Sequence, residues 1–331
     1  MSDIADFIIV GAGSAGCILA NRLSAHPSHR VLLIEAGARD WNPLLRVPLM
    51  TGMLLRGGYA NWSFMTEPEP QLGNRRLSWP RGKVVGGSSS INGMLFARGL
   101  PSDFDAWAQR GLSGWSFEDC LPAFKRLEAH EDGETEQRGG GGPLPVTRPP
   151  QDNPLFDAFI EAGRSAGHRV TENFNGASPE GFGRTEFAIR RGERWSSARA
   201  YLDPARRRPN LRVVTHAHLL RILFEGGRAV GVEVAVRGQV KRLRAEREVI
   251  LSAGTIGSPM ALLHSGVGDA DSLTALGIGI VADRPEVGRN LQDHLLVRVE
   301  HACTRPITLH QITRADRAAL ALVQAMVFGT G

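Results

Sequence analysis

Cysteine is scarce in this sequence of 331 residues. The three cysteines, Cys17, Cys120 and Cys303, lie far apart and are odd in number. This pattern excludes a disulfide framework and a zinc site built on paired cysteines. Free thiols suit a reducing compartment, so we expect a cytoplasmic protein.

Long apolar runs are also missing. The first apolar run, Phe7–Val10, has the place of a buried strand and leaves no room for a signal peptide. The longest late run, Ala318–Phe328, contains Gln324 and is shorter than the roughly 20 residues that a membrane-spanning helix needs. The sequence therefore predicts no transmembrane segment.

Lysine is scarce too, and the net charge of +5 comes almost wholly from arginine: of 39 basic residues only three are lysine. The densest run, Arg206–Arg208, lies between two prolines, as expected of a solvated turn. We therefore expect no nucleic-acid partner. With 42% hydrophobic and 22% charged residues, the chain is typical of a globular protein long enough for two domains.

The strongest positive signal is a glycine pattern near the amino end. The apolar run Phe7–Val10 leads directly into Gly11, Gly13 and Gly16, spaced G-x-G-x-x-G, and a helical stretch follows. A second apolar run, Val31–Ile34, ends in Glu35, 24 residues after Gly11. A strand, this glycine turn, a helix and an acidic strand end together predict a dinucleotide site. The alternative is a glycine turn in some other βαβ unit.

Each part of this unit has a physical task. The first glycine allows the tight turn, the second lets a pyrophosphate approach the backbone, and the third lets helix and strand pack closely. The helix start offers free N–H groups to the phosphates, and the carboxylate accepts hydrogen bonds from the adenosine ribose. The expected contact residues are Gly11, Gly13, Ser14, Ala15, Gly16, Glu35 and Ala36.

Further elements follow along the chain. Residues 37–80 are rich in proline and predict a lid or functional loop, and residues 101–129 and 154–167 predict helices. Short β-type runs between Leu211 and Val236 predict a small antiparallel meander. The strand 248–253 runs into Gly254, which suits a return to the main sheet near the cofactor.

Three separated motifs together resemble the glucose–methanol–choline (GMC) family of flavoprotein oxidoreductases. The first is the glycine pattern above, and the second is GKVVGGSSSINGMLFARG, Gly82–Gly99. The third is GTIGSPMALLHSGVG, Gly254–Gly268, followed by VGRNLQDH. In it Ala261 replaces a larger aliphatic residue. Within the family the chain is most similar to the choline dehydrogenase and alcohol dehydrogenase branch.

The resemblance implies an α/β fold with FAD as cofactor. It implies a Rossmann-like FAD-binding domain with a parallel sheet and a small meander, over residues 1–153 and 197–297. An incomplete α+β substrate-binding domain would take residues 154–196 and 298–331. In the second motif, glycine backbone, Ser88–Ser90 hydroxyls and N–H groups suit pyrophosphate or flavin edge atoms. The further cofactor contacts that the resemblance implies are Val84, Gly87, Ser88, Asn92, Gly93, Met94, Leu95, Leu219, Gly254 and Asp293.

Some of these assignments have plainer alternatives. Core packing would explain Val84, Met94, Leu95 and Leu219 equally well, and Asp293 could serve only as a loop cap. Where some relatives carry a histidine bonded covalently to the flavin, this sequence has Ile91, which predicts non-covalent FAD.

No histidine is assigned as catalytic. In the family the base is a histidine paired with a second His or Asn in a C-terminal region, which we expect beyond Gly331; residues 315–331 resemble the helix that leads into it. His294 and His264 follow motif residues but suit structural roles. His216 and His218 lack an identifiable partner carboxylate, and His301 and His310 fall in the expected substrate domain.

Two functions therefore compete. One is FAD-dependent oxidation of a primary alcohol, with choline as a candidate substrate. The electrons would pass to an acceptor such as a quinone, and a quinone acceptor would bring the protein to the membrane periphery. The other is a flavin-binding fragment without turnover, or one completed by a separate chain. A lyase or photodecarboxylase of the same family has no positive feature here, and an NAD-dependent dehydrogenase leaves the second motif without a role.

Overall fold

A computed structural model describes residues 3–149, 153–176, 178–294, 296–297, 299–308, 317, 319–321 and 323–324. The chain forms two compact units. The first comprises residues 1–45, 51–92 and 196–298, and the second residues 46–50, 93–195 and 299–331. Residues 93–153 thus fall in the second unit, although we expected them in the FAD-binding domain. Compactness does not say which ligand a unit binds, so the expected domain boundaries stay a prediction.

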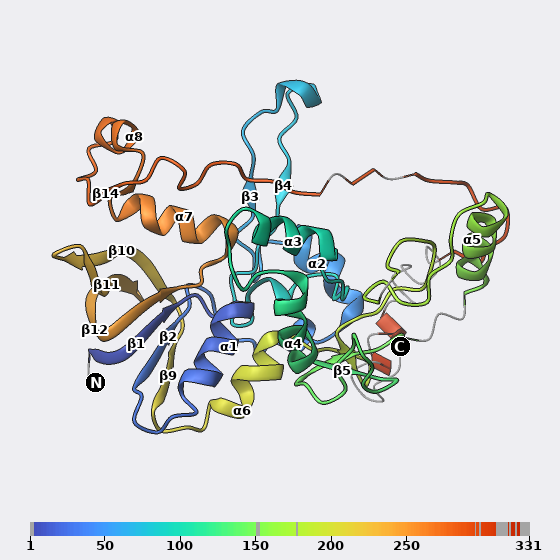
Figure 1. Cartoon of the computed structure of the whole chain (residues 1–331), viewed down its shortest axis with the longest axis horizontal. Coiled ribbons are helices and arrows are strands. Elements are labelled where there is room, and N and C mark those ends of the chain that lie inside the picture. Colours follow the sequence, from blue (N-terminus) through green and yellow to red (C-terminus); the bar gives the residue numbers. More distant parts are fainter. Residues whose placement is uncertain are drawn as a thin grey trace. The chain divides into compact units, whose positions relative to one another are not determined.

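A six-stranded sheet organises the first unit, in the order β10-β11-β12-β1-β2-β9 (Figure 1). Strand β1 (Ile4–Val10) pairs in parallel with β2 (Val31–Ile34) and with β12 (Gln239–Leu251), and β2 pairs in parallel with β9 (Leu211–Val214). Strands β10 (Ala217–Glu225) and β11 (Arg228–Val236) complete the sheet as an antiparallel meander with β12. The expected α/β fold with a parallel sheet and a small meander is confirmed.

The composition of the meander differs from the prediction. Its third strand is β12, and the run at 211–214 instead forms the parallel edge strand β9. Strand β12 is antiparallel to β11 over its first half and parallel to β1 over its second. That first half, residues 239–246, is mostly exposed and charged, so it carries little of the apolar alternation by which a strand is recognised in sequence.

Apolar residues of the central strands form the core of this unit. Ile8, Val10, Leu32 and Ile34 are almost fully buried and pack with Val232 and Val234 of the meander. Helix α1 (Ser14–Leu23) packs on β1 and β2, and α7 (Gly254–His264) packs on β10. Both helices therefore begin at loops that follow central strands of the sheet.

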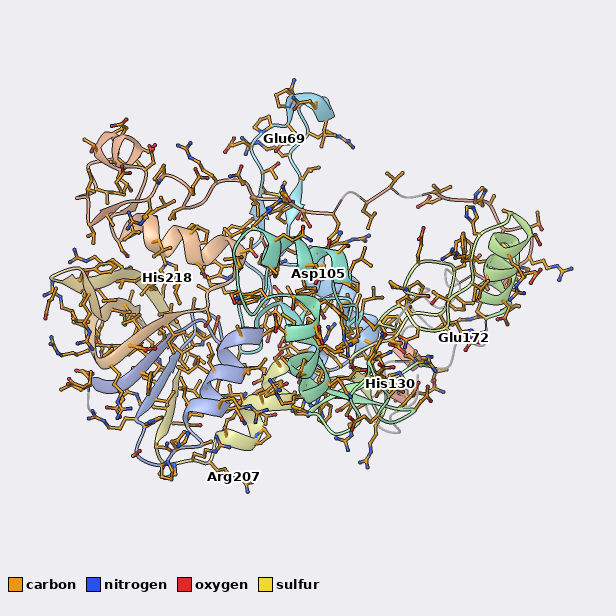
Figure 2. All side chains as sticks on the ribbon, in the orientation of Figure 1. Glu69, Asp105, His130, Glu172, Arg207 and His218 are labelled. Carbon is orange, nitrogen blue, oxygen red and sulfur yellow. The ribbon has the colours of Figure 1, made fainter. Side chains whose placement is uncertain are left out.

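Smaller elements complete the first unit. They are η1 (Pro43–Leu45), α2 (Thr51–Arg56), β3 (Phe64–Met65), η3 (Pro70–Leu72), β4 (Ser78–Trp79), η4 (Gly87–Ser90), η5 (Ala198–Leu202), α6 (Asp203–Ala205), β13 (Val267–Gly268), α8 (Ala270–Ala275) and β14 (Ala282–Asp283). The β3–β4 pair carries Glu69 near its tip (Figure 2). The expected loop-rich segment 37–80 thus contains one short hairpin and short helices.

The second unit is built from short elements around a polar centre. It contains η2 (Pro48–Met50), α3 (Pro101–Gln109), α4 (Phe117–Leu127), β5 (Glu128–His130), β6 (Leu144–Val146), α5 (Pro154–Ser165), β7 (Ile189–Arg190) and β8 (Glu193–Arg194). The helices expected within 101–129 and 154–167 are confirmed. Of residues 315–331, those described are helical, and the others lie outside the described residues, as does His310.

The sequence predicts no membrane-spanning segment and no disulfide framework. Among the described residues, no helix is long and apolar enough to cross a membrane. Cys17, Cys120 and Cys303 are all free thiols.

Candidate cofactor site

The first glycine loop closes tightly between β1 and α1. Gly11 has φ +97°, and a Cβ there would lie 2.6 Å from the Ser252 carbonyl oxygen. A Cβ on Gly16 would lie 1.9 Å from the Gly11 carbonyl oxygen. The left-handed backbone at position 11 therefore favours glycine, and position 16 has no room for a side chain, as the pattern predicts.

Gly13 differs from the other two glycines because the space beside it is open. A Cβ there would meet nothing closer than the Gly87 Cα, at 3.9 Å. Gly13 is also the N-cap of α1, and no side chain caps that helix. The first-turn N–H groups of an α-helix have no partner within the helix, so this end can receive an anion.

The second glycine loop packs directly on the first. The Gly86 N–H donates to the Ala12 carbonyl at 2.7 Å, and a Cβ on Gly87 would lie 2.7 Å from the Gly13 Cα. Gly87 (φ +56°) opens the short helix η4, which also lacks a side-chain cap. The two motifs, more than 60 residues apart in sequence, thus form one backbone surface.

Helix α7 supplies a third uncapped start beside the same surface. It begins at Gly254 (φ +80°) without a side-chain cap. Helices α4, α5 and α8 are capped by the side chains of Ser116, Asn153 and Asp269, whereas α3 and α6, whose residues do not line the cavity, also lack a side-chain cap; what sets α1, η4 and α7 apart is that their starts line one pocket. Three uncapped N-termini lining one pocket concentrate N–H groups and positive dipole ends, which favours a ligand with adjacent negative charges.

Glu35 lies at the same pocket, at the end of β2. Its two carboxylate oxygens accept the N–H groups of Ala12 (2.9 Å) and Gly37 (2.8 Å). Burial raises the pKa of this carboxyl to about 6, although both hydrogen bonds act in the opposite direction. The carboxylate is held rigidly, and each oxygen keeps a lone pair for a ligand hydroxyl.

The cavity between these elements has a volume of about 570 Å³, and part of its lining is an apolar wall. Trp62 and Phe64 stack at 5.8 Å between ring centroids with an interplanar angle of 6°. His218 lies 5.7 Å from Trp62, and the Lys83 ammonium lies 4.4 Å from the centre of the same ring (Figure 2 labels His218). Burial, with Lys83 and His264 nearby, lowers the pKa of His218, which favours a neutral imidazole. The wall suits a flat aromatic group.

The structure brings ten of the predicted contact residues together around this cavity. They are Gly11, Gly13, Ser14, Ala15, Glu35, Ala36, Gly87, Ser88, Leu219 and Gly254. Among the three serines of the second motif, the Ser89 and Ser90 hydroxyls donate to carbonyls of their own loop. The Ser88 hydroxyl accepts from the Gly82 N–H and keeps its own hydrogen for a ligand.

The other predicted residues do not line the cavity. Gly16 packs beneath the loop, Val84 is fully buried, and the Asn92 N–H donates to the Ser88 carbonyl. Asp293 is exposed, and its carboxylate accepts the N–H of the next residue. Gly93, Met94 and Leu95 belong to the second unit. Their role at the cofactor stays a prediction.

Sequence reasoning missed the apolar wall. Its residues are Trp62, Phe64, Ala217, Met260 and Ala261, and Arg81, Gly82, His218 and His264 line the same cavity. Several of them lie inside or beside the family-like motifs, but a tryptophan in a loop has no spacing rule that marks it as a ligand contact. Among the described residues no group of three or more His, Cys, Asp or Glu could hold a metal ion. His294 and His301 are exposed.

Comparison with known proteins gives a consistent family. The sequence model described as GMC oxidoreductase matches residues 5–296. Oxygen-dependent choline dehydrogenase of Brucella suis biovar 1 (strain 1330) is 48% identical over 327 residues, covering 99% of this chain and 59% of the relative. Mitochondrial choline dehydrogenase of Mus musculus is 48% identical over 320 residues, covering 94% of this chain and 53% of the relative.

Solved structures agree with the sequence relatives. Pyridoxine 4-oxidase from Mesorbium loti is 39% identical with a TM-score of 0.82, covering 88% of this chain and 57% of that one. Formate oxidase of Aspergillus oryzae RIB40, studied for its FAD modification, is 27% identical with a TM-score of 0.89, covering 100% and 59%. The chain therefore spans little more than half the length of the proteins that it matches.

Proposed function

Because the chain belongs to the GMC oxidoreductase family, whose members are FAD-binding flavoproteins, we propose that it binds FAD and forms the cofactor-binding part of an alcohol dehydrogenase. Its substrate would be a primary alcohol, and choline is the first candidate because the relatives that are 48% identical are choline dehydrogenases. The product would be the aldehyde.

The observation that carries the proposal is the set of three uncapped helix starts at one cavity. The N-termini of α1, η4 and α7 would hold the two phosphates of a dinucleotide, at the open space beside Gly13. Glu35 would accept the ribose hydroxyls with the lone pairs that its backbone partners leave free. The Trp62–Phe64 wall would hold a flat ring against the loops.

Alcohol oxidation removes a hydride from the carbinol carbon and a proton from its hydroxyl. Bound FAD supplies the hydride acceptor. The residues of this chain would hold the cofactor and fix its orientation. We place the base that takes the proton, the family's histidine pair, in sequence that the relatives have beyond the matched part, and we assign no histidine of this chain to that role.

The cofactor would be held without a covalent bond. Ile91 stands at the position where some relatives carry a flavin-linked histidine, and its aliphatic side chain is buried. Such a side chain offers no nucleophile, so acid should release the flavin intact.

A second function is favoured by the length of the match. The chain covers 59% of its choline dehydrogenase relatives, so on its own it could bind flavin without turnover. We propose that a further segment or a separate chain completes the substrate domain. A quinone or similar acceptor would then reoxidise the flavin, from a cytoplasmic protein at the membrane periphery.

The test has two arms. The purified, desalted chain is supplied with FAD, and its visible spectrum is recorded before and after acid precipitation; flavin released into the supernatant supports non-covalent binding, and flavin kept in the pellet contradicts it. Dye-linked oxidation of choline and of simple primary alcohols then separates the two functions. Turnover above a flavin-free control rejects the inactive fragment.

A further inference from the structure

Two segments of backbone hold Trp62 at the cofactor cavity. The Trp62 N–H donates to the Arg81 carbonyl at 2.8 Å, and the Lys83 N–H donates to the Ala60 carbonyl at 2.8 Å. The two segments thus pair in antiparallel fashion at the base of the hairpin that β3 and β4 form (Figure 1). Because Trp62 and Arg81 both line the cavity, this pairing determines where the aromatic part of its wall lies.

The loop that carries Trp62 is strained on both sides of this residue. Ala60 has φ +57° and Ser63 has φ +54°, left-handed conformations that cost a non-glycine residue energy. Such conformations persist only where the surroundings impose them. The place of the Trp62 ring therefore depends on the contacts that hold residues 60–63.

Asn61 supplies such contacts from inside the loop. Its side-chain carbonyl accepts the Ser63 N–H at 2.9 Å and the Arg81 N–H at 3.0 Å, so it joins both segments. Its amide donates to the Leu55 carbonyl of α2 at 3.1 Å. Asn61 is only 7% exposed, so water competes little for these bonds, and losing them would leave buried backbone groups unsatisfied.

The neighbours of Trp62 indicate which end of a dinucleotide would meet its ring. The Ala217 N–H donates to the Glu35 carbonyl at 2.9 Å, and the next residue, His218, has its ring 5.7 Å from that of Trp62. Trp62 therefore lies toward the Glu35 end of the cavity. In the proposed function Glu35 accepts the hydroxyls of the adenosine ribose, and the base on that ribose is adenine. The ring beside Trp62 would thus be the adenine and not the flavin.

We propose that Asn61 is a positioning residue for the adenine of the bound dinucleotide. It fixes the strained loop so that Trp62 presents its ring to the base. Asn61 does not itself line the cavity, so it acts on affinity through Trp62 and not by touching the ligand. This inference rests on the proposed function. Asn61, Trp62, Glu35 and the other residues that line the cavity all belong to the first unit.

The experiment is a double-mutant cycle in the full chain, with FAD and ADP as probes, because ADP carries the adenine and a diphosphate but no flavin. The variants are Asn61→Ala, Trp62→Ala and the two combined; Asn61→Ser takes the place of Asn61→Ala if the latter does not fold. The readouts are the Kd of each probe and Tm.

The control is Asn210→Ala in the same unit. The Asn210 amide also donates to backbone carbonyls, those of His26 and His29, both at 2.9 Å. The Asn210 carbonyl accepts the Val31 N–H at the start of β2, whereas Glu35 follows the end of that strand. The control therefore removes comparable bonds at the other end of the sheet.

Trp62→Ala is expected to raise the Kd of both probes about tenfold, since it removes the ring on which the base stacks. Asn61→Ala is expected to raise both Kd values about fivefold. The combined variant should bind no more weakly than Trp62→Ala alone, because both changes remove the same contact. The control is expected to lower Tm and leave both Kd values unchanged.

Wild-type Kd values in Asn61→Ala with only Tm lowered, or losses that add in the combined variant, would overturn the inference and leave FAD binding intact. A rise in Kd for FAD alone, or a chain that binds FAD but not ADP, would overturn it equally. Failure of the unsubstituted chain to bind FAD would overturn the inference and the proposed function together.

Discussion

Gly13→Ala separates the folding role of the glycine loop from its ligand role. Gly13 has φ −76° and ψ −162°, which alanine adopts without strain, and its Cβ would meet nothing closer than 3.9 Å. Replacing a glycine by alanine at a compatible position stabilises a protein by about 0.4–1 kcal/mol, because the unfolded chain loses freedom. The free energy of unfolding of the FAD-free chain should therefore stay equal or rise by that amount.

FAD affinity should fall in the same variant. The added methyl group projects into the space where a phosphate would meet the α1 N–H groups, and losing one charge-assisted hydrogen bond costs about 1.5–3 kcal/mol. That cost raises the Kd by about 10- to 150-fold. Titration of the chain with FAD, followed by flavin fluorescence or calorimetry, measures the Kd, and denaturant unfolding without FAD measures the stability.

Two further glycine-to-alanine variants serve as comparisons for Gly13→Ala. Gly52→Ala, on the exposed face of α2 with nothing within 4 Å of the added Cβ, should leave the Kd unchanged. Gly16→Ala places its Cβ 1.9 Å from a backbone carbonyl oxygen and should lose stability before affinity can be measured. The reasoning is refuted if Gly13→Ala binds FAD as tightly as the unsubstituted chain, or if it unfolds as readily as Gly16→Ala.

Three other outcomes follow from buried groups. Burial raises the pKa of Glu35 from 4.5 to about 6, so between these values the folded chain keeps a proton that the unfolded chain releases. The contribution of Glu35 to the free energy of unfolding should therefore be largest below pH 4.5 and be lost as pH rises through 6. Urea titrations of Glu35→Gln should lack this fall between pH 4.5 and 6 relative to the unsubstituted chain. Glu128→Ala leaves the buried Arg98 and Arg138 without their shared carboxylate and should lower the free energy of unfolding by about 3–5 kcal/mol. Glu67→Ala breaks an exposed pair and should lower it by less than about 1 kcal/mol. Equal losses of unfolding free energy in the two variants would contradict this. Burial raises the pKa of Cys17 to about 12, so a thiol reagent at pH 8 should modify the exposed Cys303 in the native chain and Cys17 only after unfolding. Mass spectrometry locates the modified residues, and rapid modification of Cys17 in the native chain would be inconsistent with its burial.

The fold could be predicted where a short sequence pattern determines a local structure. The strand, glycine turn, helix and acidic strand end of residues 7–35 all form as expected, because each step depends on neighbours in the chain. The prediction was wrong where partners are distant. Strand β9 joins β2 across some 180 residues, and the start of β12 shows little apolar periodicity, because Leu243 and Ala245 are the buried residues among 239–246 and the others face solvent.

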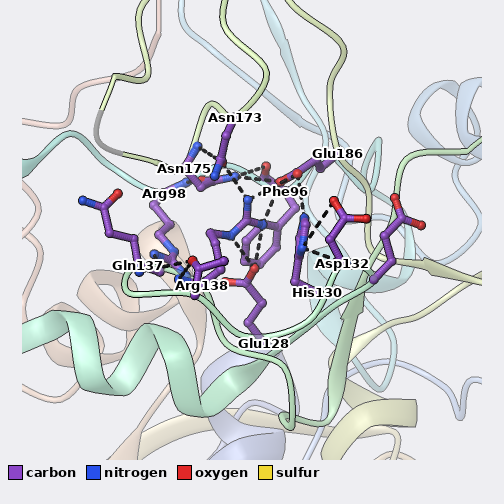
Figure 3. A network of polar contacts seen from close by, with 12 residues as sticks. Phe96, Arg98, Glu128, His130, Asp132, Gln137, Arg138, Asn173, Asn175 and Glu186 are labelled. Atoms are coloured by element: carbon purple, nitrogen blue, oxygen red, sulfur yellow. Dashed lines mark hydrogen bonds and ion pairs between the residues drawn. The ribbon is translucent and has the colours of Figure 1, made fainter.

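The residues of the candidate site likewise fall into those that the sequence indicated and those that it did not. Gly87 and Gly254 were named from the family resemblance, and both line the cavity with a left-handed φ, a conformation that favours glycine. Trp62 and His218 were missed because a loop and an edge strand bring them together only in three dimensions. The buried polar network around Glu186 (Figure 3) was missed for the same reason, since its members come from four separate segments, at residues 128–130, 138, 175 and 186.

In a site made chiefly of backbone groups, the position of a substitution determines how much it weakens FAD binding. Three helix starts contribute backbone N–H groups, which substitutions other than proline leave in place, so changing Ser14 or Thr255 to alanine leaves the anion-binding surface intact. The glycines instead control whether a ligand can reach that surface, and Glu35 is the one buried carboxylate on the cavity wall among the residues that the structure describes. Loss of affinity should therefore concentrate at Gly13, Gly87 and Glu35, and a scan in which the serine and threonine variants weakened FAD most would mean that side chains, not helix starts, hold the phosphates.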